Sequence, residues 1–72
     1  MSDLELLSQV ALLEDMPERG LVRGQVGTVV EFLSPSVAEV EFCDDQGRTY
    51  ALAALRFEEL IRLRHGAIEQ VA

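Results

Sequence analysis

Apolar and polar residues alternate along several short stretches of the chain, and this period of two is the pattern of half-buried β-strands. The alternation predicts strands at residues 26–33, 37–43 and 48–53. Turn-forming residues separate them, as "SPS" at 34–36 and as "DDQG" at 44–47. Short strands divided by turns predict an all-β fold. For a chain this small we expect a five-stranded barrel, because closure of the sheet removes exposed strand edges.

The N-terminal segment allows two interpretations. "SDLE" at 2–5 matches a helix capping box, and the apolar residues that follow fall at helical spacing, so residues 3–15 could form one helix. The alternative is a brief helical turn over 3–7 followed by a strand from about residue 9 to 14. We favour the turn and strand, because a barrel this small offers little groove for a helix.

Turn chemistry predicts the pairing of the hairpin at 44–47. Asp45 and Gln46 suit a type I turn, and Gly47 supplies the left-handed position of a bulge. This loop places Asp44 opposite Arg48, and the residues before and after it then pair in step. The predicted inward face carries Ala38, Val40, Phe42, Tyr50 and Leu52. The predicted outward face carries Glu39, Glu41, Cys43, Thr49, Ala51 and Ala53.

The hairpin around "SPS" is less well defined. A three-residue loop would pair Glu31 with Glu39, and it would also pair Leu33 with Val37 and Val29 with Glu41. It would turn four residues inward: Val26, Thr28, Val30 and Phe32. Two glutamates directly opposite one another repel. A longer loop, a bulge, an arginine or a binding partner must therefore compensate.

The glycines of "GLVRGQVGTVVEF" at 20–32 precede a strand that has to bend sharply to enter a small barrel. Gly24 and Gly27 can adopt a positive φ or allow close backbone approach at such a bend. A phosphate-binding loop would require the glycines to lead into a helix N-terminus, and here they lead into a strand. We therefore interpret them as structural.

Composition narrows the classes of function. The 72 residues make at most one domain, and 13 acidic residues against 6 basic ones, all arginine, give a net charge of −7. Such a surface disfavours nucleic acid and favours a basic protein partner, although solubility is a competing explanation of the charge. Cys43 has no partner for a disulfide, and neither a cationic leader nor an apolar stretch of membrane-spanning length is present. We expect a cytoplasmic protein without membrane contact.

Residues for catalysis or metal binding are sparse. Cys43 and His65 are the one nucleophile–base pair available, but Asp44 beside Cys43 would raise the pKa of the thiol. Asp44 and Asp45 lack the further ligands of a calcium loop, and no residues have zinc spacing. Arginines gathered into a basic strip, with Arg62 and Arg64 on one side of a strand, compete with ordinary ion pairs such as Asp44–Arg48. We expect no enzyme, no cofactor and no metal.

The outward face of the sheet is the candidate binding surface. It is predicted to hold Glu31, Glu39 and Glu41 around the small side chains Ala51 and Ala53. A flat patch rimmed by carboxylates suits an arginine-bearing partner. An ordinary solvated face is the competing interpretation.

Three stretches carry a resemblance to a known family: "VALLEDMPERGLVRGQVGTVVEF", "AEVEFCDDQGRTYAL" and "ALRFEELIRL". Together they resemble domain of unknown function 4926, a family of small uncharacterised bacterial proteins, over about residues 9–63. "RGQVGTVVEF" is also similar to the entry strand of SH3-like barrels, including KOW-type domains. The resemblance implies an SH3-like β-barrel with a 3₁₀ turn at "RFEE" and a strand at 9–14. It implies no established activity and no catalytic residue; some members of such families are suspected of acting beside toxin-like partners.

We expect residues 1–72 to form one domain, with a barrel over about 9–63 and a C-terminal tail over 64–72. The predicted function is a non-enzymatic protein-binding module, of the antitoxin or immunity type, that neutralises a basic partner through its acidic sheet face. A nucleic-acid-binding KOW-like barrel and an accessory subunit of a larger enzyme remain alternatives. The oligomeric state and the order of the tail stay open.

Overall fold

The computed structural model describes residues 4–63 and confirms the all-β prediction. Its elements follow one another as β1 (Gln9–Leu12), the 3₁₀ turn η1 (Pro17–Arg19), β2 (Val26–Ser34), β3 (Val37–Cys43), β4 (Thr49–Arg56), the 3₁₀ turn η2 (Phe57–Glu59) and β5 (Leu60–Arg62). The segment with two interpretations contains a strand, and "RFEE" contains the expected 3₁₀ turn. The predicted capping box at 2–5 lies partly outside the described residues, and the predicted tail at 64–72 lies wholly outside them.

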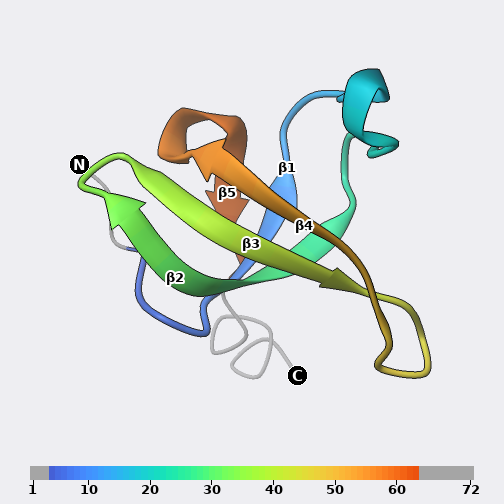
Figure 1. The fold of residues 1–72 in the computed structure, drawn as a ribbon. Helices are drawn as coiled ribbons and strands as arrows, with labels where there is room; N and C mark the ends of the chain where they lie inside the picture. The colour runs from blue at the N-terminus through green and yellow to red at the C-terminus, as the bar shows by residue number, and fades with distance from the viewer. Residues whose placement is uncertain (1–3, 64–72) are drawn as a thin grey trace, which may run out of the picture.

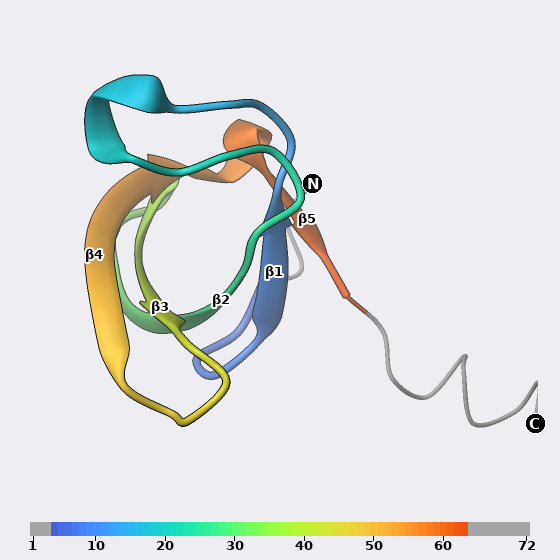
Figure 2. The same ribbon diagram turned by 90° about the vertical axis from the view of Figure 1, so that its right-hand side faces the viewer.

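The five strands form one antiparallel sheet in the order β4-β3-β2-β1-β5. The sheet curls around its own inner face, and the segment that carries η1 crosses one end of the curl (Figure 1, Figure 2). This arrangement is compatible with an SH3-like barrel. Because the two ends of the sheet order are β4 and β5, these are the edge strands.

A hydrogen-bonded turn at Glu5–Ser8 stands where a helical turn over 3–7 was expected. The Ser8 amide donates to the Glu5 carbonyl at 3.0 Å, and Leu7 takes a positive φ of 68°. The Ser8 hydroxyl accepts from the Glu5 amide at 2.9 Å. The turn feeds directly into β1, so it reverses the chain just before the sheet begins.

Apolar residues from all five strands fill the inside of the curl. The buried cluster comprises Val10, Leu12, Met16, Leu21, Val29, Ala38, Val40, Phe42, Ala53, Leu55 and Leu60. Met16 and Leu21 come from the loop that carries η1, and an isolated antiparallel bridge joins them. This loop is therefore part of the core as well as a connection between strands.

Gly24 and Gly27 serve the two purposes expected of them. Gly24 has a φ of +90°, a conformation that side chains rarely allow. Gly27 has an ordinary φ, but a Cβ there would stand 2.6 Å from Val40 Cγ1 and 2.9 Å from the Glu41 carbonyl oxygen. The absence of a side chain at Gly27 lets β2 bend closely over β3.

The β3–β4 hairpin confirms the predicted turn but not the predicted register beyond it. Gly47 has a φ of +81°, and the Asp44 amide donates to the Arg48 carbonyl at 2.9 Å. Cys43 pairs with Thr49 as expected, but a bulge follows and Tyr50 becomes the extra residue.

The shift by one residue turns the rest of β4 over. Phe42 pairs with Ala51 and Val40 with Ala53, in place of Tyr50 and Leu52. Ala53 is 3% exposed, whereas Tyr50 and Leu52 are 50% and 56% exposed. The prediction that Tyr50 and Leu52 point inward was therefore wrong, because a bulge exchanges the two faces of a strand.

The β2–β3 hairpin contains two register shifts; a bulge was one of the possibilities that the sequence left open, but it does not separate the two glutamates. Glu31 pairs with Glu39 as predicted, but register shifts on either side of this region bring Val29 opposite Val40 and Ser34 opposite Val37. Val29 is fully buried. The predicted inward face of β2 was wrong for Val26, Thr28 and Val30, which are exposed or only partly buried. Phe32 shares the interior side with its partner Ala38 but remains 38% exposed.

Replacing Gly27 with alanine should destabilise the protein by about 1–3 kcal/mol, because the new Cβ overlaps Val40 and the β3 backbone. Urea unfolding followed by circular dichroism measures the loss. Thr28→Ala is the control, since Thr28 is the next residue along β2 and is only partly buried. Equal stability of Gly27→Ala and the wild type would contradict the close approach of β2 to β3.

The register of β4 can be tested with two neighbouring substitutions. Ala53→Asp should cost about 3–5 kcal/mol, the penalty of a buried charge without a partner, and should unfold a domain of this size. Leu52→Asp should leave the fold intact, because Leu52 is exposed. Two-dimensional NMR spectra distinguish folded from unfolded protein. The opposite order of effects would restore the register predicted from the sequence.

Candidate functional site

The outer side of the sheet gathers three glutamates over β2 and β3. Glu31 on β2 lies opposite Glu39 on β3, and Glu39 lies opposite Ala54 on β4. One row further along, Glu41 lies between Thr28 and Leu52. Directly opposed residues in an antiparallel sheet share one face. We call the surface of Glu31, Glu39, Glu41, Leu52 and Ala54 the acidic face.

The two alanines predicted for this surface lie on the other side of β4. Ala53 is buried opposite Val40, and Ala51 is partly buried opposite Phe42. The bulge at Tyr50 is the physical reason, because it moves every later residue of β4 to the opposite face. Leu52 and Ala54 take the places that were predicted for Ala51 and Ala53. The structure therefore brings the three predicted glutamates together and replaces the apolar part of the patch.

No ion pair within residues 4–63 joins an arginine to the acidic face. The arginine ion pairs lie elsewhere: Arg48 is 3.3 Å from Asp44, and Arg56 lies 3.3 and 3.4 Å from Glu58 and Glu59. Among the three glutamates, Glu41 has a hydrogen-bond partner, the hydroxyl of Thr49. Glu31 and Glu39 thus face each other with no cation between them in the described part of the chain, and like charges in this position repel.

Arg48 and Arg56 form their ion pairs at opposite ends of β4. Arg48 lies in the turn after β3, where it contacts Asp44 as predicted, and Arg56 lies before η2. The side chain of Asp15 accepts the backbone amide of Arg23 at 2.8 Å. Arg64, which was predicted to share a side with Arg62, lies outside the described residues. The ion-pair interpretation therefore holds for Asp44–Arg48.

The Cys43–His65 pair cannot be assembled from the described residues, because His65 lies beyond residue 63. Cys43 is exposed, and its Sγ lies 3.7 Å from the hydroxyl of Thr49. Within residues 4–63, no three histidine, cysteine or acidic side chains come close enough to bind a metal ion together. No helix in this part of the chain is long and apolar enough to span a membrane.

Asp44 organises the turn that precedes β4. Its carboxylate accepts the amides of Gln46 and Arg48 at 2.9 and 3.0 Å. The hydrogen bond from the Arg48 amide is the largest cause that lowers the pKa of Asp44 below its usual 3.8. The charged carboxylate therefore stabilises the turn, and protonation weakens it.

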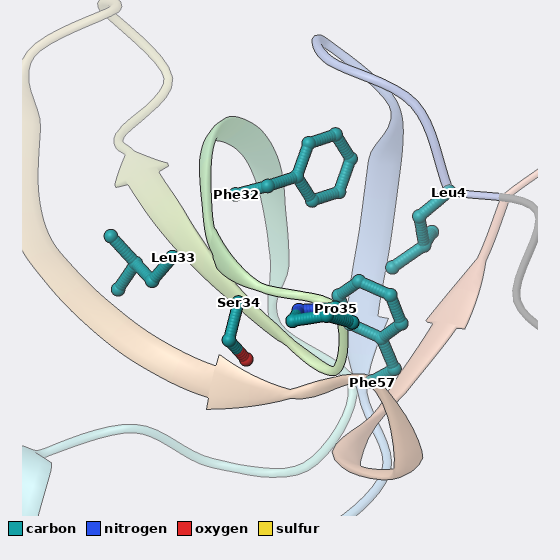
Figure 3. A pocket seen from close by; sticks show the side chains of 6 residues that line it. All are labelled: Leu4, Phe32, Leu33, Ser34, Pro35 and Phe57. Carbon is teal, nitrogen blue, oxygen red and sulfur yellow. The ribbon is translucent and has the colours of Figure 1, made fainter.

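An open hollow of about 600 Å³ lies near the "SPS" turn. Leu4, Phe32, Leu33, Ser34, Pro35 and Phe57 line it (Figure 3). The rings of Phe32 and Phe57 meet edge to face, with centroids 5.9 Å apart. Sequence reasoning missed this hollow, because its walls come from the N-terminal segment, the "SPS" turn and η2. Only the tertiary fold brings these segments together.

Comparison with known proteins gives a match to a family model. The family model described as "Domain of unknown function (DUF4926)" matches residues 6–62, which is more than half of the chain. No curated protein and no solved structure matches this sequence.

Replacing Asp44 with alanine should lower the melting temperature at neutral pH, because the two amides lose their acceptor. Since the folded pKa of Asp44 is depressed, its contribution is present above pH 3.8 and disappears as the pH falls through the folded pKa. The difference in melting temperature between wild type and Asp44→Ala should therefore shrink in acid. Asp45→Ala is the control in the same turn. A difference that stays constant from pH 7 to about pH 2 would contradict this role.

Proposed function

The chain belongs to the DUF4926 family, and from this membership and the acidic face we propose that it is a non-enzymatic module that binds a basic protein. The partner docks on the acidic face with arginine side chains. Binding blocks the basic surface of the partner, which is the mode of action of an antitoxin or immunity protein.

The observation that carries this proposal is the Glu31–Glu39 pair. Two carboxylates directly opposite each other on neighbouring strands destabilise a free sheet. No arginine of the described chain pairs with them. A cation from a partner would remove the repulsion, so the folded module gains more from a basic ligand than an ordinary solvated face would.

Arginine fits this face better than lysine does. A guanidinium presents a planar fork of donors that can bind two carboxylate oxygens at once, whereas an ammonium is a point charge. Leu52 and Ala54 add an exposed apolar strip beside the glutamates. The small side chain of Ala54 lets a partner approach the sheet closely. The flat side of a guanidinium and its methylene stem can lie on such a strip.

The charge of the whole chain supports the same partner. A net charge of −7 raises the rate at which a basic protein meets this module. The single cysteine and the bacterial proteins of the family resemblance support a role in the bacterial cytoplasm, where thiols stay reduced.

The test uses ¹⁵N-labelled protein titrated with an extended peptide in which arginine alternates with alanine. We expect the amide signals of β2, β3 and β4 around the acidic face to shift. The double variant Glu39→Lys/Glu41→Lys should weaken binding by about tenfold or more, because it removes two carboxylates from the face. Its melting temperature should not fall below that of the wild type, since both side chains are partly exposed and Glu39→Lys removes the repulsion with Glu31.

Two controls separate the face from general charge. Glu14→Lys/Glu18→Lys makes the same change in net charge at exposed positions near η1, and it should keep most of the affinity. A peptide with lysine in place of arginine should bind more weakly to the wild type. Equal losses in the two double variants would contradict a specific acidic face. Salt-sensitive binding of RNA or DNA in a gel shift would support the KOW-like alternative instead.

A further inference from the structure

We propose that the outer edge of β4 is a self-association site, at which two copies of this chain pair their β4 strands antiparallel about a two-fold axis. This inference concerns the edge of the sheet and does not rest on the proposed binding function of its face. It follows from three properties of β4: an edge with no neighbouring strand in the described chain, a central segment without charge and self-complementary side chains.

The edge is free within the described chain. β4 ends the sheet order and pairs with β3 on one side only. The Phe57 amide donates to the Ser36 carbonyl, which fixes the phase of the β3–β4 ladder. Alternate residues of an antiparallel strand direct their amides to opposite sides. The backbone groups of Leu52, Ala54 and Arg56 therefore point away from β3. The Arg56 amide already donates to the Glu59 carboxylate at 2.9 Å, so Leu52 and Ala54 carry the groups that a second strand would pair with.

The sequence of β4 lacks the devices that usually protect an edge strand. Such strands tend to be short or to carry proline, lysine or an inward charge. The segment Thr49–Leu55 reads "TYALAAL", seven residues without a charge, a proline or a glycine. The bulge at Tyr50 and the charge of Arg56 affect only the two ends of the strand. An exposed edge of this composition attracts a further strand.

A second copy complements this edge. With the two-fold axis at Ala53, every paired residue from 50 to 56 stays inside β4. Leu52 of each copy then lies opposite Ala54 of the other, so a large side chain meets a small one on the exposed face. Leu52 and Ala54 both direct their amide and carbonyl groups away from β3, so Leu52 of one copy can form hydrogen bonds with Ala54 of the other.

The glutamates of the acidic face oppose this pairing only weakly. The only charged side chains on β4 are the two copies of Arg56, one at each end of the paired region. The nearest glutamates of the acidic face lie on β3, so the two β3 strands would be three strand spacings apart, about 14 Å. Exposed charges at that separation are largely screened at physiological salt, where the Debye length is about 8 Å.

Sedimentation velocity over a range of concentrations tests the proposal, with a dimer expected at the upper end. Ala54→Pro removes an amide that points away from β3, so the fold keeps its own ladder while the dimer loses hydrogen bonds. We expect its dimer dissociation constant to rise by about tenfold or more. Ala54→Thr is the matched control, because threonine keeps the amide and favours strands; its dimer should persist.

Leu52→Lys gives a second, independent variant at an exposed side chain. It places a charge of each copy near the two-fold axis and should also abolish the dimer while the circular dichroism spectrum stays unchanged. A wild type that remains monomeric at all concentrations would overturn the proposal. So would a dimer that survives in folded Ala54→Pro or Leu52→Lys protein. Peptide binding by the acidic face is measured separately, so either proposal can fail without the other.

Discussion

The close approach of β2 to β3 at Gly27 is the contact on which the rest of the structure depends. A side chain at this position would overlap Val40 and the backbone of Glu41, so only glycine allows β2 to bend there. The bent sheet places β1 and β5 across the curl from β4 (Figure 2). The curled sheet encloses Phe42 and its neighbours in the core.

Bulges in this curved sheet determine which side chains of β2 and β4 face the solvent. The extra residue Tyr50 turns β4 over, so that Ala53 and Leu55 enter the core and Leu52 and Ala54 face outward. Tyr50 itself does not leave the core region completely. Its ring lies 6.4 Å from that of Phe42, and its hydroxyl accepts a hydrogen bond of 2.8 Å from the Gln25 side chain. The residue thereby links the start of β4 to the loop before β2.

β4 contributes to both surfaces for which we propose a binding role. Its outer side chains complete the acidic face, and its free edge offers backbone groups to another strand. In the proposed dimer the two sheets would be continuous across β4. The glutamates of each acidic face would lie on that copy's own β2 and β3, and Leu52 and Ala54 of both copies would lie between the two sets. The repulsion between Glu31 and Glu39 is a cost within each copy that pairing at the edge does not relieve. The basic partner that we propose would relieve this repulsion in the monomer and in the dimer alike.

The sequence by itself determined that β2, β3 and β4 are strands, the turn at Asp44–Gly47, the role of Gly24 and Gly27, and the meeting of Glu31 with Glu39. These features depend on residues close together in the chain, where alternation and turn chemistry act directly. Only the tertiary structure showed which face of β4 is buried, because the bulge at Tyr50 depends on how the whole sheet curves. The tertiary structure also created the hollow around Phe32 and Phe57 and left β4 at the edge of the sheet. Both features depend on where distant segments lie once the sheet has curled.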